Sequence, residues 1–174
     1  MGQNPSDAAG GVSITPASPA DGEDIAALWA PWIRDTAITF APDPRSGAEV
    51  AAMITDRHAA GHGFFTARDA AGTLLGFASY SQFRAGRGYA RTMEHTVILS
   101  PDAAGLGLGR ALMVAIESHA RDAGAHLMIA AVSGENPAGR AFHEALGYRP
   151  CGILPGAGFK FGRYLDLHLL SKEL

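Results

Sequence analysis

The chain has 174 residues, a formal net charge of −3, 47% hydrophobic residues and one cysteine. These values are typical of one globular domain with a substantial core, and no basic block indicates a nucleic-acid partner. No stretch approaches the roughly 20 apolar residues of a membrane helix, and the single Cys151 allows no internal disulfide, so we expect a cytoplasmic protein that does not bind membranes.

Residues 1–11 lack the apolar core of a signal peptide. They match the loose myristoylation pattern M-G-x-x-x-S, but their small residues favour a disordered tail. We therefore expect a tail over residues 1–11 and a single domain over residues 12–174.

Hydrophobic periodicity predicts strands and helices in alternation along this domain. Pro31 is expected to kink or break the first helix, and Ser46 with Glu49 forms a capping-box pair that opens the second. Residues 155–163 are expected to be a connection between the last two strands. The predicted strands are 12–15, 64–68, 74–83, 92–99, 126–132, 148–154 and 164–170, and the predicted helices are 21–34, 46–61, 108–124 and 136–147.

The strongest chemical signal is the run Ser-Pro-Asp-Ala-Ala-Gly-Leu-Gly-Leu-Gly-Arg at 100–110, between a strand and a helix. Its glycines remove side chains where the backbone turns, so N–H groups at the helix N-terminus can face a phosphate or pyrophosphate. A P-loop is excluded because Arg110 and Ala111 stand where Lys and Ser/Thr are needed. The spacing G-x-G-x-G also differs from the dinucleotide fingerprint G-x-G-x-x-G. Taken alone, the run is also compatible with a glycine turn that binds nothing.

This run resembles motif A of the GCN5-related N-acetyltransferases (GNAT), usually written Gln/Arg-x-x-Gly-x-Gly/Ala, although Ala104 stands where Gln or Arg is usual. Residues 136–148, Asn-Pro-Ala-Gly-Arg-Ala-Phe-His-Glu-Ala-Leu-Gly-Tyr, resemble motif B of the same family. The intervening helix and strand are also what the family has between its two motifs. The resemblance implies an α/β GNAT acyltransferase fold, with a mixed central β-sheet, splayed central strands and about four flanking helices.

Segments 93–101, 142–148 and 158–166, with the loop 36–40, together resemble the phosphinothricin and methionine sulfoximine N-acetyltransferases. This resemblance implies an enzyme that moves acetyl from acetyl-CoA to the α-amino group of a small amino acid or analogue, by direct attack of the amine. It also implies a homodimer.

The reaction needs a base, because an ammonium group cannot attack a thioester until it has lost a proton. Glu94 is the expected base, since it lies on the strand before the glycine run in an apolar neighbourhood that raises a carboxyl pKa. His143 replaces the tyrosine that often precedes Glu144 in the family, and we expect it to protonate the departing thiolate or to orient the site.

The resemblance implies two further sets of contacts. Residues expected to bind acetyl-CoA are Val97, Ile98, Leu99, Gly105, Leu106, Gly107, Leu108, Gly109, Arg110 and Asn136. Residues expected to bind the acceptor are Thr36, Phe40, Arg84, Ala85, Gly86, Glu94, His95 and Thr96, and Arg84 is the expected carboxylate anchor because of its planar guanidinium.

Several alternatives stay open at this point. The enzyme can instead acetylate a peptide N-terminus, a polyamine or an aminoglycoside, although the basic loop 84–91 disfavours cationic acceptors. A non-catalytic acyl-CoA-binding module is disfavoured by Glu94 and His143. No metal site is expected, because His58 and His62 lack a third ligand, and Cys151 lacks the neighbouring base that a nucleophile needs.

Overall fold

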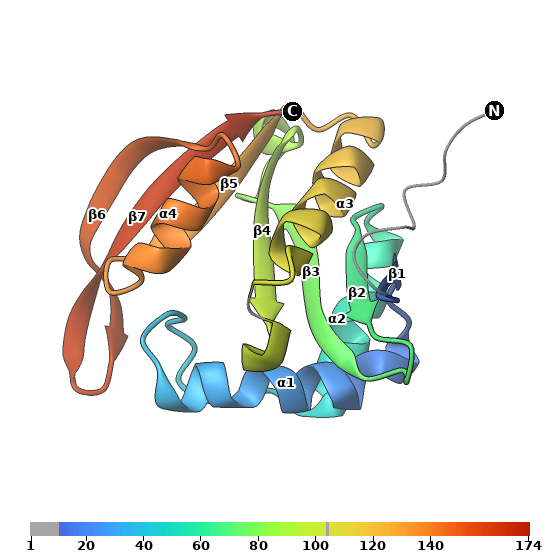
Figure 1. The fold of residues 1–174 in the computed structure, drawn as a ribbon. Helices are drawn as coiled ribbons and strands as arrows, with labels where there is room; N and C mark the ends of the chain where they lie inside the picture. The colour runs from blue at the N-terminus through green and yellow to red at the C-terminus, as the bar shows by residue number, and fades with distance from the viewer. Residues whose placement is uncertain (1–10, 104) are drawn as a thin grey trace.

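The computed structural model describes residues 11–103 and 105–174, which form one seven-stranded sheet and four α-helices (Figure 1). Apart from Gly11, the expected N-terminal tail lies outside the described residues, as does Ala104. The strands are β1 (Ser13–Pro16), β2 (Phe64–Arg68), β3 (Leu74–Gln82), β4 (Thr92–Leu99), β5 (Leu127–Ser133), β6 (Arg149–Lys160) and β7 (Arg163–Glu173). The α-helices are α1 (Gly22–Asp35), α2 (Gly47–Ala59), α3 (Leu108–Asp122) and α4 (Pro137–Ala145), and short 3₁₀ turns occupy Pro19–Asp21, Arg87–Tyr89 and Pro101–Ala103.

The sheet is mixed, and its two central strands diverge. The strand order is β1-β2-β3-β4-β5-β7-β6, and every neighbouring pair is antiparallel except β4 with β5. Within the described ranges, β4 and β5 are matched only from Thr92 with Leu127 to Glu94 with Ile129. Beyond Glu94 the two strands separate (Figure 1), which confirms the expected fold with splayed central strands.

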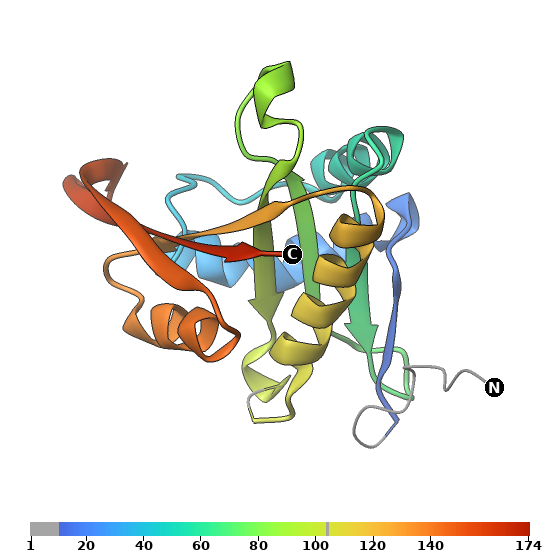
Figure 2. The same cartoon turned by 90° about the horizontal axis from the view of Figure 1, so that it is seen from above.

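Helices cover both faces of the sheet, with α3 and α4 on one side and α1 and α2 on the other (Figure 2). Successive strand residues point to opposite faces, so each strand contributes to both layers of the core. On β3, Phe77 packs with α1 and α2, whereas Ala78 and Tyr80 pack with α3. On β4, Ile98 packs in the layer with α1 and α2, and Met93 packs in the layer with α3.

Helix α1 continues through Pro31 to Asp35, so the expected break at this proline is wrong. Pro31 is exposed, and the carbonyl group that loses its N–H partner there can be hydrated. Ile25, Trp29 and Ile33 are buried against the sheet on both sides of the proline. This packing stabilises helical residues on both sides of the proline.

The last two strands are longer than expected, because most of the predicted connection 155–163 belongs to the β6–β7 hairpin. Register shifts between Pro150 and Gly152 and between Leu154 and Gly158 accommodate the prolines and glycines of β6. Strand β6 lies at the edge of the sheet and has a neighbouring strand on one side only. An irregularity there breaks fewer hydrogen bonds than it would in a central strand.

The spacing of apolar residues predicts an inner face of α4 made of Ala138, Ala141, Phe142, Ala145 and Leu146, and this prediction is partly wrong. Ala138, Ala141 and Ala145 are exposed, while His143 is buried and Phe142 is half-buried. Helix α4 contacts mainly β5, beside the gap between the central strands, so only a narrow stripe of it is covered.

Candidate active site

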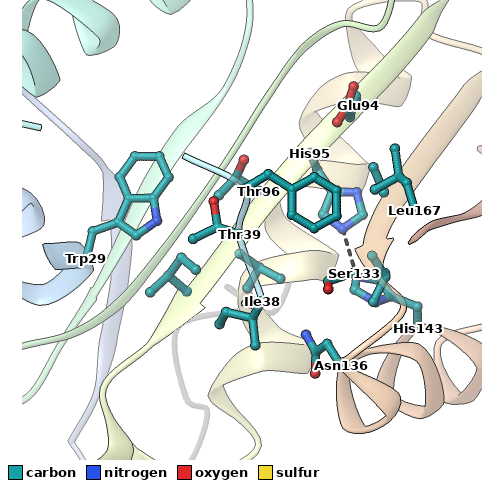
Figure 3. A pocket seen from close by; sticks show the side chains of 15 residues that line it. Trp29, Ile38, Thr39, Glu94, His95, Thr96, Ser133, Asn136, His143 and Leu167 are labelled. Atoms are coloured by element: carbon teal, nitrogen blue, oxygen red, sulfur yellow. Dashed lines mark hydrogen bonds between the residues drawn. The ribbon is translucent and has the colours of Figure 1, made fainter. Parts of the chain in front are cut away.

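A cavity of about 320 Å³ lies where β4 and β5 diverge (Figure 3). The divergence exposes the β5-facing edge of β4, and the loop after α1, the start of α4 and β7 complete the walls. The described residues that line it are Trp29, Ile38, Thr39, Phe40, Glu94, His95, Thr96, Val97, Ile98, Ala131, Val132, Ser133, Asn136, His143 and Leu167.

The cavity brings together residues that the sequence analysis placed in one site from distant segments. Both expected catalytic residues, Glu94 and His143, line it. The other expected site residues in its wall are Phe40, His95, Thr96, Val97, Ile98 and Asn136. Thr36 is half-buried on the same loop as Phe40 but does not line the cavity.

Glu94 is half-buried on β4, on the same face of the strand as Ile98. Burial raises the pKa of its carboxyl group, and the positive charge of Arg57 on α2 opposes this rise. Arg57 was not singled out from the sequence; its Nε atom is buried and has no hydrogen-bond partner among the described residues. The charge of Glu94 therefore responds to a cation on α2, a helix that covers this face of the sheet.

His95, on the opposite face of β4, forms a buried pair with His143 of α4 (Figure 3). The two Nε2 atoms lie 2.9 Å apart, and the Nδ1 atom of His143 lies 2.7 Å from the carbonyl oxygen of Gly139. A carbonyl only accepts, so Nδ1 of His143 carries a hydrogen, and in the neutral ring its Nε2 accepts from His95. Burial, followed by the proximity of His143, lowers the pKa of His95 to about 3, so His95 is neutral near pH 7.

The histidine pair rests against a second buried polar group. The ring of Tyr148 lies 5.5 Å from that of His95 and 5.4 Å from that of His143. Its hydroxyl donates to Glu117 of α3 over 2.9 Å, and Lys172 of β7 donates to the other oxygen of that carboxylate over 2.6 Å. These contacts fix the tyrosine ring against both imidazoles. A glutamate on the buried face of a predicted amphipathic helix is the sequence signal that points to such a group.

The glycine run adopts the conformation that glycine favours. Gly105 and Gly107 have φ of 77° and 72°, and Gly107 immediately precedes α3. A Cβ atom on either would meet no described atom within 4 Å, so the loop is open around them. The first N–H groups of α3 have no partner within the helix, which makes this end a site for an anion.

The remaining residues of the run have different environments. Gly109 packs closely, because a Cβ atom there would lie 3.1 Å from the ring of Phe142. Leu108 is buried, whereas Leu106 is 47% exposed. Arg110 donates to the carbonyl of Ala145 at the end of α4 over 3.3 Å. The unpaired edge of β4 and the helix terminus that follows it fit an extended ligand that carries a phosphate group.

The structure does not bring Arg84, Ala85 and Gly86 to the cavity. They lie exposed on the loop between β3 and β4, which projects from the sheet (Figure 2), and none of them is among the described lining residues. The guanidinium carbon of Arg84 lies 5.3 Å from the centre of the Tyr89 ring. The role of Arg84 as a carboxylate anchor stays a prediction.

Over residues 11–103 and 105–174, no group of three or more His, Cys, Asp or Glu side chains is arranged to hold a metal ion. None of the helices in those ranges has the length and apolar character needed to cross a membrane.

A sequence model of the acetyltransferase (GNAT) family matches residues 27–148. The chain therefore belongs to the GNAT family of acetyltransferases. Within that family it is 36% identical over 163 residues to the L-methionine sulfoximine/L-methionine sulfone acetyltransferase of Pseudomonas aeruginosa, covering 94% of this chain and 95% of the relative. It is 33% identical over 152 residues to the phosphinothricin N-acetyltransferase of Alcaligenes faecalis, covering 86% and 76%.

Solved structures agree with this assignment. An acetyltransferase from Salmonella typhimurium, solved with its cofactor acetyl-CoA, superposes with a TM-score of 0.89 at 29% identity and covers 95% of both chains. A phosphinothricin acetyltransferase of the GNAT superfamily from Sinorhizobium meliloti, in complex with acetyl-CoA, gives a TM-score of 0.88 at 31% identity, covering 94% of this chain and 88% of that one.

Proposed function

We propose that this protein transfers the acetyl group of acetyl-CoA to the α-amino group of a small amino acid or amino-acid analogue of the phosphinothricin, methionine sulfoximine or methionine sulfone type. The observation that carries the proposal is the cavity at the β4–β5 divergence, where a carboxylate with a raised pKa faces the same space as a buried histidine pair. The similarity to relatives named for these substrates supports the choice of acceptor.

The cosubstrate would lie along the free edge of β4. Val97 and Ile98 would meet its pantetheine arm, and residues 105–110 would hold the pyrophosphate at the start of α3. The Oδ1 atom of Asn136 accepts from the N–H of Gly139 over 2.8 Å, which leaves Nδ2 to donate to the acyl end. The carbonyl of Leu99 already accepts from the indole N–H of Trp32 over 3.0 Å, so it is less available to accept a hydrogen bond from the cosubstrate. Bound acetyl-CoA supplies the activated thioester.

Each catalytic residue would move or hold one proton. Glu94 would take the proton from the acceptor ammonium, directly or through water, and so free the nitrogen lone pair for attack. As the neutral ring, His143 has its hydrogen on Nδ1 and accepts at Nε2 from His95, so it would orient the departing sulfur. It would protonate the sulfur only as the imidazolium, in which Nε2 also carries a hydrogen to donate. The Gly139 carbonyl holds the His143 ring in the required orientation.

The acceptor would enter from the side of the loop after α1. Phe40, His95 and Thr96 would surround it in the cavity. Thr36 lies on the same loop as Phe40, and its hydroxyl oxygen accepts from the N–H of Ile38 over 3.4 Å. Arg84, Ala85 and Gly86 would have to approach from the β3–β4 loop to bind its carboxylate.

The proposal is tested by measuring thiol release from acetyl-CoA with a panel of acceptors. The panel contains phosphinothricin, methionine sulfoximine, methionine sulfone, ordinary amino acids, a polyamine and a peptide with a free N-terminus. We expect turnover with the amino-acid-like acceptors. Turnover confined to the polyamine or peptide would keep the acetyl transfer and overturn the acceptor.

A further inference from the structure

Lys160, near the end of β6, is buried although it carries a charge, with 5% of its surface exposed. Its Nζ atom donates to three backbone carbonyls, those of Ile33, Thr36 and Thr39, over 2.5, 2.8 and 2.8 Å. An ammonium group has three hydrogens, so these contacts use every donor that it has. Lys160 therefore has none left to bind a substrate, and its effect must come through the backbone that it holds.

That backbone is the end of α1 and the loop that forms one wall of the cavity. The last carbonyls of an α-helix have no partner within the helix, and a cation is favoured beside them. Lys160 places a positive charge at the end of α1 and donates to its last carbonyls, and it also donates to the carbonyl of Thr39 in the segment that follows. Ile38, Thr39 and Phe40 of this segment line the cavity, whereas Lys160 does not.

A second contact joins the same two segments. Gly158 of β6 lies so close to Phe40 that a Cβ atom on it would fall 2.3 Å from a ring carbon. The absent side chain at 158 thus permits the position of the Phe40 ring. This contact is independent of the hydrogen bonds of Lys160, yet it fixes the same loop.

We propose that Lys160 and Gly158 are positioning residues that set the acceptor-side wall of the cavity, by holding residues 36–40 against the β6–β7 hairpin. This inference rests on the proposed function, because it assigns that wall to the amino-acid acceptor. The hairpin thereby determines acceptor binding without touching the acceptor.

The test compares three variants of the full-length protein. Lys160→Met removes the donors and keeps an unbranched side chain one atom shorter, and Gly158→Ala displaces Phe40 while leaving Lys160 intact. The control is Arg149→Met, which removes one positive charge from an exposed position on the same strand. For each variant we would measure KM for the acceptor, KM for acetyl-CoA, the melting temperature, and amide hydrogen exchange of residues 36–40 in the absence of ligands.

We expect KM for the acceptor to rise about tenfold or more in Lys160→Met and in Gly158→Ala, because small displacements of a binding wall have large effects on productive binding. KM for acetyl-CoA should change less than about twofold, since its proposed contacts lie on β4, on residues 105–110 and at Asn136, outside residues 36–40. Amide exchange of residues 36–40 should be faster in both variants. The control should match the parent protein.

A lower melting temperature with unchanged acceptor KM and unchanged exchange at 36–40 would overturn the inference and leave Lys160 with a general structural role. Equal changes in both KM values would overturn it as well. If the parent protein acetylates no acceptor in the panel, the proposed function fails, and the exchange of residues 36–40 still decides whether Lys160 and Gly158 hold the loop. Gly158→Ala keeps the inference testable if Lys160→Met does not fold.

Discussion

Glu94 lies where burial and a neighbouring cation act on its charge in opposite directions. The raised pKa of its carboxyl group favours the protonated form, while Arg57 stabilises the carboxylate. The balance between them sets the pH above which the proposed base can accept a proton. The chemistry of the site therefore depends on α2, which contributes no described residue to the cavity.

Replacing Glu94 with Gln should reduce kcat/KM by about 100-fold or more, the usual contribution of a general base. In the parent protein, kcat/KM should rise with pH through a value above 4.5, and this rise should be absent in the variant. A pH profile of kcat/KM measures both effects. The control is Glu173→Gln, because the side chain of Glu173 is 76% exposed. An unchanged profile in Glu94→Gln would contradict the proposed role.

The same substitution should change stability with a defined sign. A carboxyl group whose pKa is raised on folding contributes stability below its unfolded pKa, and this contribution is lost as the pH rises through the folded pKa. Glutamine stays neutral, so Glu94→Gln should melt at a higher temperature than the parent at pH 8. The measurement is thermal unfolding of both proteins at pH 8 and at pH 4. The difference between their melting temperatures should be smaller at pH 4 than at pH 8.

Arg57 gives an independent test of the same balance. Arg57→Met removes the charge that lowers the pKa of Glu94, so the acid limb of kcat/KM should move to higher pH, while the rate well above that limb changes little. The measurement is the pH profile, with the exposed Arg121→Met as the control. An acid limb that stays at the same pH in Arg57→Met would show that Arg57 does not act on Glu94.

At the scale of elements, the glycine run separates two uses of glycine. Gly105 and Gly107 are needed for their positive φ, whereas Gly109 is favoured because a Cβ atom there would crowd the ring of Phe142. The first use shapes the loop that would hold the pyrophosphate, and the second sets how closely α3 and α4 approach.

Gly107→Ala should cost about 1–2 kcal/mol of stability, because an L-residue is strained in the left-handed region and a Cβ atom there would meet no neighbour. It should also raise KM for acetyl-CoA and leave KM for the acceptor unchanged. Gly152→Ala is the matched control, since its Cβ atom would also meet no described atom within 4 Å but its φ is not positive. Denaturant unfolding and steady-state kinetics measure the two effects. Equal behaviour of the two variants would contradict a special role for Gly107.

Most helices and strands could be predicted from local pattern. The capping box of Ser46 and Glu49 is present as expected, because it depends on residues within one turn. The family and the splayed sheet followed from two motifs whose spacing reflects one helix and one strand.

The interactions that could not be predicted are those between segments far apart in the chain. The pairing of His95 with His143 and the contacts of Lys160 with the end of α1 depend on the tertiary fold. Pro31 misled the prediction because the burial of Trp29 and Ile33 outweighs the lost hydrogen bond. The prolines and glycines of β6 led to the wrong prediction of a connection at 155–163, because an edge strand tolerates bulges at such residues.

At the scale of the whole molecule, the β6–β7 edge carries apolar side chains that a soluble domain usually covers. Five of the exposed large hydrophobic residues belong to this hairpin: Ile153, Leu154, Phe159, Phe161 and Tyr164. This surface is the natural candidate for the homodimer that the subfamily resemblance implies.

If the hairpin forms that contact, Ile153→Asp should convert a dimer into a monomer, because burying an unpaired carboxylate at an apolar interface is unfavourable. Light scattering after size-exclusion chromatography measures the mass. Val114→Asp is the control, since Val114 is similarly exposed, at 57%, but lies on α3. A monomeric parent protein, or a dimer that survives Ile153→Asp, would contradict this assignment.

The hydrogen bonds of Lys160 have a consequence for the protein's own chemistry. Thioesters acylate uncharged amines without an enzyme, and exposed lysines are the usual targets. The chain has only two lysines, and its other basic side chains, histidine aside, are arginines, which remain charged and do not react. Lys160 is buried against backbone carbonyls, and Lys172, whose side chain is 26% exposed, is held in an ion pair with Glu117. A protein that works with a reactive acyl donor thus has both of its lysines engaged with other parts of its own chain.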